Sequence, residues 1–212
     1  MTTGERPEGE ALIIRNVEFL GGMSEKGGWR PPSDLPEIAF AGRSNVGKSS
    51  LLNTLVRRRS FARVSRTPGR TREINFFRVN NGFVMVDLPG YGYARISKEK
   101  QAGWRPLIEA YLKRTDQLRG IVLLLDIRRE PSDDDRAMLD FLADVEVPTI
   151  VALTKTDKLS KTAARERAAE IARSLALDPD QVISFSAHTG EGRVELLSAI
   201  VDLLQTPEAT RE

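Results

Sequence analysis

Short apolar runs bounded by turn residues recur along the chain and predict six β-strands. These runs are EIAFAG (37–42), INFFRVN (74–80), FVMVDL (83–88), GIVLLLD (120–126), PTIVALT (148–154) and VISFS (182–186). Stretches with helical apolar spacing lie between most of them, at 49–56, 98–114, 133–145, 162–175 and 194–204. Strands that alternate with helices indicate βαβ units, so we expect an α/β fold with a mostly parallel sheet and helices on both faces.

One pair of runs breaks this alternation. Only Asn81 and Gly82 separate the runs 74–80 and 83–88, and such a short connection is typical of a β-hairpin. We therefore expect a six-stranded sheet with one antiparallel strand at its edge. In this interpretation residues 11–205 form a single domain, with flexible tails at 1–10 and 206–212.

The composition narrows the chemistry. The 212 residues include no cysteine and one histidine, which excludes disulfides, thiolate metal sites and multi-histidine zinc clusters. No apolar run has the length of a membrane span, and the polar N-terminus lacks the apolar segment of a signal peptide. We expect a cytoplasmic protein without a membrane partner.

Arginines are concentrated in one stretch, although the net charge is only +2. The acid-free segment 57–72 contains Arg57, Arg58, Arg59, Arg63, Arg66, Arg70 and Arg72. These side chains would suit an RNA backbone or the phosphates of a nucleotide. Alternatively, the first three are the solvated end of the helix predicted at 49–56, where positive charge suits the helix dipole.

The segment GRSNVGKS (42–49) has the pattern GxxxxGK[ST] and lies between a predicted strand and a predicted helix, as a phosphate-binding loop requires. Its glycines let backbone N–H groups surround phosphates, and the helix N-terminus favours the same anion. Lys48 would bridge the β- and γ-phosphates, and Ser49 would bind Mg²⁺. The predicted nucleotide-binding residues here are Gly42, Arg43, Ser44, Asn45, Val46, Gly47, Lys48 and Ser49.

Two further segments would face the same phosphates. DLPG (87–90) ends a predicted strand, where Asp87 would hold Mg²⁺ through water and the N–H of Gly90 would sense the γ-phosphate. Thr71 would complete the Mg²⁺ shell only while the γ-phosphate is present; the alternative is a simple Pro-Gly turn with an incidental threonine. The predicted residues are Gly69, Arg70, Thr71, Arg72, Glu73, Asp87, Leu88, Pro89 and Gly90.

TKTD (154–157) follows the fifth predicted strand and indicates the base. The Asp157 carboxylate would accept both the ring N–H and the amino protons of guanine, a donor pair that adenine lacks, so GTP is favoured over ATP. Lys155 would lay its stem along the base or ribose, and SAHTG from Ser186 would offer a backbone N–H to the guanine oxygen. Taken alone, TKTD also fits an ordinary turn with a capping aspartate. The predicted residues are Thr154, Lys155, Thr156, Asp157, Phe185, Ser186 and Ala187.

With these segments in order, residues 17–205 resemble the EngB family, also called YihA or YsxC, of translation-factor-class P-loop GTPases. The resemblance rests on LPEIAFAGRSNVGKSSLLN, TPGRTREINFF, DLPGYGYA, DIRREPSDDD and TKTDK. It implies a three-layer P-loop GTPase fold, GTP hydrolysis with Mg²⁺, assembly of the large ribosomal subunit and a link to cell division and septation. The implied partners are a guanine nucleotide and the large ribosomal subunit or its precursor, with rRNA and protein but not DNA, and we expect a monomer.

Catalysis must depend on something other than a glutamine after the DLPG glycine, because that position is Tyr91. We expect slow intrinsic hydrolysis, with Lys48, Thr71, Gly90 and Asn45 as catalytic candidates. The resemblance implies that Asn45 holds a K⁺ ion against the phosphates; alternatively it shapes the loop through local hydrogen bonds.

Two other functions stay open at this point. A P-loop kinase would give no reason for TKTD and SAHTG. An RNA-binding or ribosome-binding module loaded with nucleotide would hydrolyse GTP negligibly.

Overall fold

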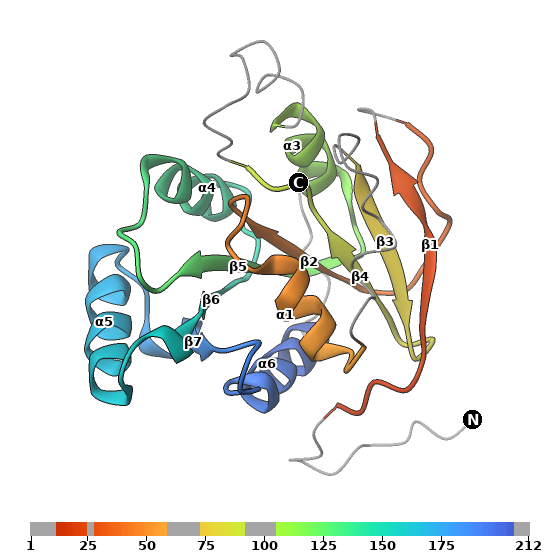
Figure 1. The fold of residues 1–212 in the computed structure, drawn as a ribbon. Coiled ribbons are helices and arrows are strands. Elements are labelled where there is room, and N and C mark those ends of the chain that lie inside the picture. The colour runs from red at the N-terminus through yellow and green to blue at the C-terminus, as the bar shows by residue number, and fades with distance from the viewer. Residues whose placement is uncertain (1–11, 25–27, 59–72, 92–104, 206–212) are drawn as a thin grey trace.

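The computed structural model describes residues 12–24, 28–58, 73–91 and 105–205. Over these residues a seven-stranded sheet has the order β1-β3-β4-β2-β5-β6-β7, with helices on both faces (Figure 1). The strands are β1 (Val17–Met23), β2 (Glu37–Gly42), β3 (Ile74–Val79), β4 (Phe83–Asp87), β5 (Leu118–Asp126), β6 (Thr149–Thr154) and β7 (Val182–Phe185). The helices are α1 (Lys48–Leu55), α3 (Arg105–Arg114), α4 (Asp133–Asp144), α5 (Lys161–Ser174) and α6 (Arg193–Gln205).

The predicted fold class is confirmed, and all six predicted strands are present. The sheet nevertheless has seven strands rather than six, and the antiparallel strand does not lie at the predicted position. A seventh strand, β1, pairs antiparallel with β3 and forms the edge, so the antiparallel strand β3 lies second from the edge. Only Met23 is fully buried in β1, and two adjacent glycines interrupt the run. Because it covers little core, β1 shows no clean alternation of apolar and polar residues.

The hairpin between β3 and β4 is also built differently from the prediction. Asn80 and Asn81 adopt the left-handed conformation, with φ of 50° and 54°. The N–H of Gly82 then donates to the carbonyl of Val79 at 2.8 Å. The two asparagines therefore make the turn, which suits a residue type that tolerates positive φ.

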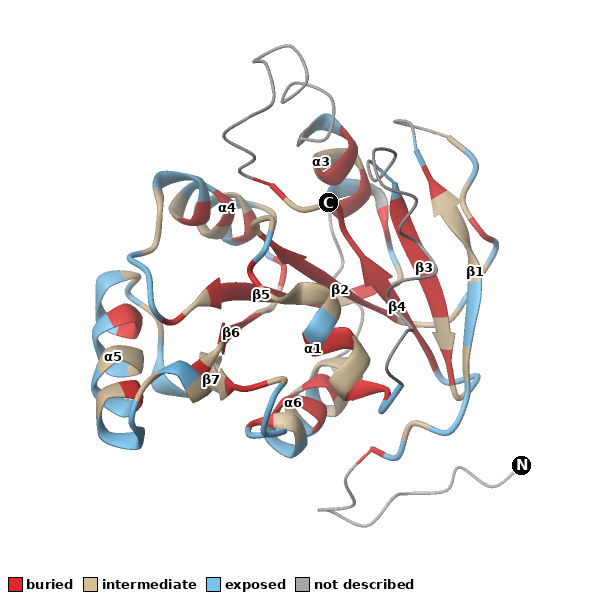
Figure 2. Ribbon diagram, in the orientation of Figure 1, coloured by how far each residue is buried: buried red, intermediate tan, exposed pale blue. Residues whose placement is uncertain are grey.

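Two layers of helices follow from the alternation of side chains along the strands. Ile38 and Phe40 of β2 pack with α1 and α6, whereas Ala39 and Ala41 of the same strand face α3 and α4. Helix α5 packs on Val151 and Leu153 of β6 on the α3 side. Figure 2 shows the strands buried in the middle and the outward faces of the helices exposed.

Helix α3 packs on the sheet through one face. Leu107, Ile108, Tyr111 and Leu112 are buried against the sheet, whereas Trp104 lies outside the described residues. The predicted tails, 1–10 and 206–212, also lie outside them. No helix in the described part of the chain is long and apolar enough to cross a membrane.

Candidate functional site

The described site segments gather at the carboxyl edge of the parallel strands, each directly after its strand. The loop 42–47 joins β2 to α1 and contains two residues in the left-handed region, Asn45 (φ 65°) and Gly47 (φ 108°). A Cβ at Gly42 would lie 2.9 Å from Cγ1 of Val46. Glycine at positions 42 and 47 is therefore required by close approach and by backbone conformation, respectively.

The DLPG segment lies directly against this loop. The Lys48 ammonium forms an ion pair with the Asp87 carboxylate, with side chains only 13% and 10% exposed. The N–H of Ser44 donates to the carbonyl of Tyr91 at 3.0 Å, and a Cβ at Gly90 would lie 3.0 Å from Oγ of Ser44. The residues predicted to bind the phosphates, in the loop 42–49, therefore lie beside Asp87, which is predicted to hold Mg²⁺ through water.

Tyr91 follows DLPG and turns its side chain into the core. Its hydroxyl donates to Oδ1 of Asp135 in α4 at 2.9 Å. Burial, together with the neighbouring Asp135 carboxylate, raises the pKa of Tyr91 well above its ordinary value, so the phenol stays protonated. This hydrogen bond therefore holds the Tyr91 hydroxyl at α4.

The TKTD segment is hydrogen-bonded to the phosphate-binding loop. The Thr154 hydroxyl donates to the carbonyl of Val46 at 2.7 Å, and the Lys155 ammonium donates to the carbonyl of Asn45 at 2.8 Å. Lys155 itself has positive φ (67°), which directs the chain into the short turn Thr156–Lys158. Two segments that are distant in the sequence therefore form one continuous surface.

Asp126, at the end of β5, is a site residue that the predictions omitted. Its Oδ2 accepts from Lys155 at 2.9 Å and from Arg128 at 2.7 Å. Burial alone would raise the pKa of Asp126, but the hydrogen bonds from Arg128 and Lys155 outweigh it and hold the pKa well below its ordinary value. The sequence shows an aspartate followed two residues later by an arginine at the end of a predicted strand, but residue spacing alone does not indicate what Asp126 contacts.

Asp157 and Ser186 form the other side of this segment. The Ser186 hydroxyl donates to Oδ1 of Asp157 at 2.8 Å, and Lys158 pairs with Oδ2 at 3.0 Å. These two hydrogen bonds lower the pKa of Asp157, so the carboxylate is ionised at neutral pH. The Ser186 N–H donates to the carbonyl of Glu191, whereas the Ala187 N–H has no partner among the described residues.

Other predicted residues are placed differently or not at all. Gly69, Arg70, Thr71 and Arg72 lie outside the described residues. Glu73 is exposed, and its Oε2 would lie 2.9 Å from a Cβ at Gly22 of β1. Phe185 is fully buried in the core, so only its backbone faces this edge. His188 is exposed.

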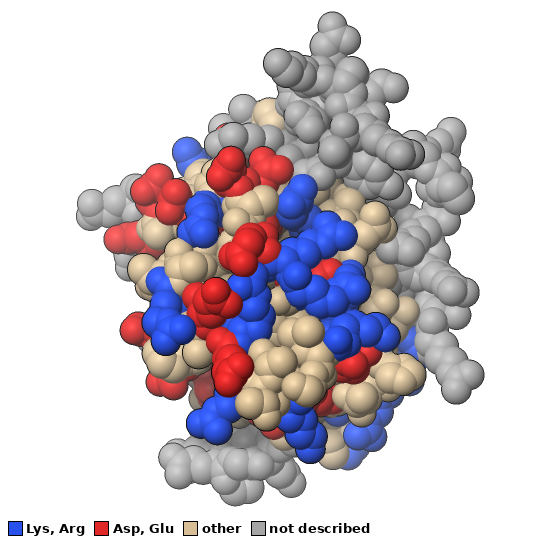
Figure 3. All heavy atoms as spheres, turned by 60° about the vertical axis from the view of Figure 1, so that its left-hand side comes forward, with Lys and Arg blue, Asp and Glu red and all other residues tan. Residues whose placement is uncertain are grey.

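Basic side chains form a group in the middle of the face that Figure 3 brings forward, with acidic side chains around them. Close pairs of opposite charge recur in the described residues, among them Lys155 with Asp126 and Lys158 with Asp157. The surface therefore mixes the two signs, and Lys155 and Lys158 are each paired with a carboxylate.

Comparison with known proteins agrees with this geometry. A family described as "50S ribosome-binding GTPase" matches residues 37–155. A probable GTP-binding protein EngB of Gemmatimonas aurantiaca is 64% identical over 197 residues, covering 93% of this chain and 97% of the relative. A second one, of Desulfosudis oleivorans, is 48% identical over 89% of this chain and 95% of the relative. The crystal structure of a probable GTP-binding protein engB has 26% identity and a TM-score of 0.68, covering 80% of this chain and 98% of that one.

A phosphate-binding loop between β2 and α1, with guanine-type segments after β6 and β7 of the same sheet, defines the P-loop GTPases. The chain is therefore a GTPase that binds guanine nucleotides, and the kinase alternative is set aside. Within that class, the chain belongs to the EngB family of GTP-binding proteins.

Proposed function

We propose that this protein is a cytoplasmic GTP-hydrolysing switch, acting as a monomer with Mg²⁺ in assembly of the large ribosomal subunit. The observation that carries the switch role is the contact of Lys155 with Asn45, supported by that of Thr154 with Val46. These bonds join the segment 154–157, which we propose recognises the base, to the loop 42–49, which we propose holds the phosphates. One nucleotide would therefore contact both, and the loop would respond to its phosphates.

The phosphate end of this site uses the loop and DLPG. The N–H groups of Ser44 and Val46 already donate to the carbonyls of Tyr91 and Arg43. Other backbone N–H groups of 43–49 and the Lys48 ammonium would hold the β- and γ-phosphates, with the positive end of α1 behind them. Gly90 approaches Ser44 closely, so its N–H is near enough to the loop to respond to a γ-phosphate. Thr71 is proposed as the group that engages only in the GTP state.

The residues present fit Mg²⁺. Ser49 and Asp87 offer hard oxygen donors, and the Asp87 carboxylate is largely buried beside Lys48. The described residues contain no cluster of three or more acidic, histidine or cysteine side chains that could hold a metal ion. This suits an ion that retains water and phosphate ligands. Bound there, Mg²⁺ would offset negative charge on the phosphates.

The guanine end would use Asp157 and Ala187. Ser186 holds the Asp157 carboxylate in position, and the ionised carboxylate can accept hydrogen bonds from two N–H groups of the base edge. Because the Ser186 N–H is already bonded to Glu191, we assign the Ala187 N–H as the donor to the guanine oxygen.

The ribosomal part rests on the name of the matching family, and we extend it to a role in cell division and septation. The test is co-sedimentation with purified large subunits in GDP and in a non-hydrolysable GTP analogue. Tighter association with the analogue supports a switch. Equal association in both nucleotides, with no effect of subunits on single-turnover GTP hydrolysis, contradicts it and favours a nucleotide-loaded binding module.

Asn45 leads to a prediction about catalysis. Its carbonyl accepts from Lys155, whereas its side chain is exposed and would face the phosphates with a K⁺ ion. We expect slow turnover that is faster in potassium chloride than in sodium chloride at equal ionic strength. Asn45→Ala should abolish this difference without abolishing GDP binding. Equal rates of the wild type in both salts would mean that Asn45 only shapes the loop. The charge that develops on the phosphates would then be stabilised by Arg70, Arg72 or a ribosomal group.

A further inference from the structure

A polar cavity of about 400 Å³ lies at the edge of the sheet opposite the nucleotide site. It is bounded by the start of β1, the end of β3, the β3–β4 turn and the residue Arg58 after α1. Helix α1 starts at the phosphate-binding loop and β4 ends at DLPG, so the end of α1 and the start of β4 mark the far edge. The nucleotide site therefore does not include this cavity.

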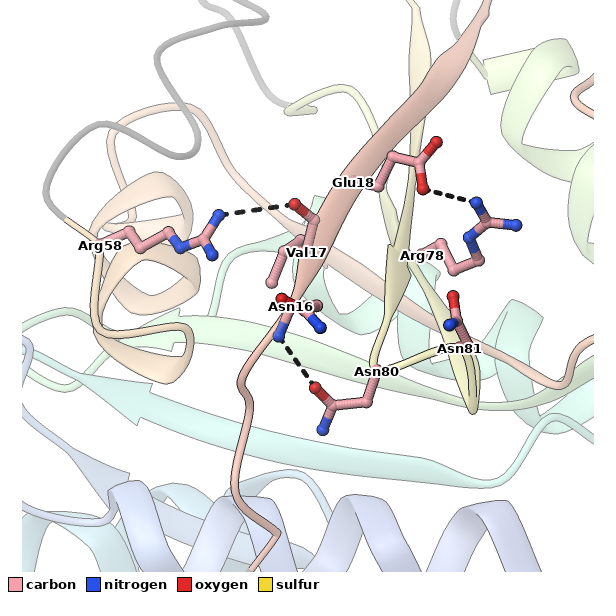
Figure 4. Close-up of a pocket in the computed structure, with 7 residues that line it drawn as sticks. All are labelled: Asn16, Val17, Glu18, Arg58, Arg78, Asn80 and Asn81. Carbon is pink, nitrogen blue, oxygen red and sulfur yellow. Dashed lines mark hydrogen bonds and ion pairs between the residues drawn. The ribbon is translucent and has the colours of Figure 1, made fainter.

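Two arginines line the cavity from different elements (Figure 4). The Arg58 guanidinium donates to the carbonyls of Val17 at 3.5 Å and Arg15 at 3.3 Å, which are long contacts to neutral groups. Arg78 pairs through Nη2 with Glu18, but its Nε is buried and has no hydrogen-bond partner among the described residues. Each guanidinium group therefore has donor capacity that the described residues do not use. The Arg78 side chain is 38% exposed, so a ligand would reach its outer nitrogens rather than the buried Nε.

Hydrogen bonds to Asn80 fix the segment that leads into β1 at one side of the cavity. Asn80 accepts from the N–H groups of Arg15 at 2.8 Å and Asn16 at 3.0 Å, and its amide donates to the carbonyl of Ile13 at 2.6 Å. Asn80 thus uses its carbonyl oxygen twice and one amide N–H in fixing the segment before β1. The side-chain amides of Asn16 and Asn81 line the same cavity, and no partner for either occurs in the described part of the chain.

We propose that this cavity binds a phosphate group of an RNA backbone, a second site separate from the guanine nucleotide. Two guanidinium groups and the Glu18 carboxylate leave one net positive charge, which matches a phosphodiester better than the larger charge of free phosphate. Arg58 and Arg78 would contact the phosphate oxygens.

The ribose would distinguish RNA from other phosphodiesters. Asn16 and Asn81 offer amides that can both donate to and accept from a 2′-hydroxyl, and the cavity has room for more than a phosphate alone. The choice of RNA rests on the proposed ribosomal role, whereas the anion site rests on the geometry.

The test is binding of a fluorescently labelled single-stranded 12-nucleotide RNA, followed by anisotropy at about 50 and 200 mM salt. Arg58→Gln and Arg78→Gln should each weaken binding about tenfold and reduce the slope of log K against log salt by about 1. Arg165→Gln on α5, an exposed arginine outside the cavity, is the matched control and should leave both unchanged. Equal effects of all three substitutions would overturn the proposal.

A second variant separates ligand binding from a purely structural role. Glu18→Gln removes the carboxylate that competes for Arg78, so RNA binding should tighten; unchanged or weaker binding contradicts the site. A matched DNA should bind less tightly than RNA, and inorganic phosphate should compete poorly. Equal binding of DNA, or displacement by phosphate alone, would overturn the assignment to RNA. GDP affinity and GTP hydrolysis, measured on the same variants, should be unchanged, so failure here would leave the proposed GTPase switch standing.

Discussion

Lys155 connects three parts of the molecule through one side chain. Its ammonium contacts the Asn45 carbonyl and the Asp126 carboxylate, 110 and 29 positions away in the sequence. Arg128 holds Asp126 through two further bonds. Because its charged end is fixed at both partners, the aliphatic stem of Lys155 is positioned before any base arrives, which reduces the entropy lost on binding.

Asp157→Asn should shift base preference from guanine toward xanthine nucleotides. The substitution replaces one acceptor with a donor, and xanthine has a carbonyl where guanine has its amino group. The Ser186 hydroxyl can still donate to the asparagine oxygen, so the fold should be retained. A competition assay between GDP and XDP measures the change; unaltered GDP selectivity would remove Asp157 from the base site.

Glu37 predicts a dependence of stability on pH. Its buried carboxylate accepts from the Tyr111 hydroxyl at 2.8 Å and pairs with Arg30. Burial raises the pKa of Glu37, although Arg30 and the Tyr111 hydrogen bond oppose this shift. The folded state therefore binds this proton more tightly than the unfolded state, and its contribution to stability is lost as pH rises above the unfolded pKa of about 4.3.

Glu37→Gln removes this titration, so the free energy of unfolding of the variant relative to wild type should increase from acidic to neutral pH. Urea unfolding at both pH values measures the difference. The exposed Glu166→Gln on α5 serves as the control. A variant that loses stability relative to wild type as pH rises would show that the ion pair with Arg30 dominates.

At the scale of elements, the start of α4 is joined through one carboxylate to Tyr91, in the segment that follows β4. Ser132 and Asp135 form a capping box, in which the Ser132 N–H donates to Asp135 Oδ2 at 2.9 Å. Oδ1 of the same carboxylate accepts from Tyr91, directly after DLPG. Helix α4 is therefore fixed to the segment that follows the phosphate site.

Tyr91→Phe should lower the free energy of unfolding by about 1–2 kcal/mol, because a buried hydrogen bond to a carboxylate is lost without a change of shape. Ser132→Ala should cost about 1 kcal/mol through loss of the cap. The double variant should deviate from the sum, since both partners share Asp135. Denaturant unfolding of all four proteins measures this coupling; strictly additive losses would mean that the two bonds are independent.

For the whole molecule, a nucleotide would connect segments that follow β2, β4, β6 and β7 and thereby stabilise the entire sheet. GDP with Mg²⁺ at about a hundred times its Kd should add about 2.7 kcal/mol to the free energy of unfolding. Lys155→Ala should weaken this effect by about 1.4 kcal/mol, as expected for a tenfold loss of affinity. Lys161→Ala at the exposed start of α5 is the control. Thermal melts with and without GDP measure this stabilisation. If GDP stabilises Lys155→Ala as much as the wild type, Lys155 does not contribute to nucleotide binding.

Much of the fold could be predicted because the core strands are recognisable from short apolar runs in the local sequence. EIAFAG and GIVLLLD are buried runs between turn residues, and helices between them leave few topologies for a parallel sheet. The edge strand β1 was missed because half-exposed residues with two glycines carry little periodic signal. Asp126 was missed as a site residue because its role depends on where Lys155 and Arg128 reach.

The sequence by itself determined the class of fold and the chemistry of the loops, since apolar periodicity and residues such as Gly47 or Asp157 act through local backbone and side-chain requirements. Only the tertiary structure decided which of these groups meet. The contacts of Lys155 with Asn45 and of Tyr111 with Glu37 join positions 110 and 74 apart, and the cavity between Arg58 and Arg78 depends on the pairing of β1 with β3. Strand order and packing set such contacts, and no local pattern encodes them.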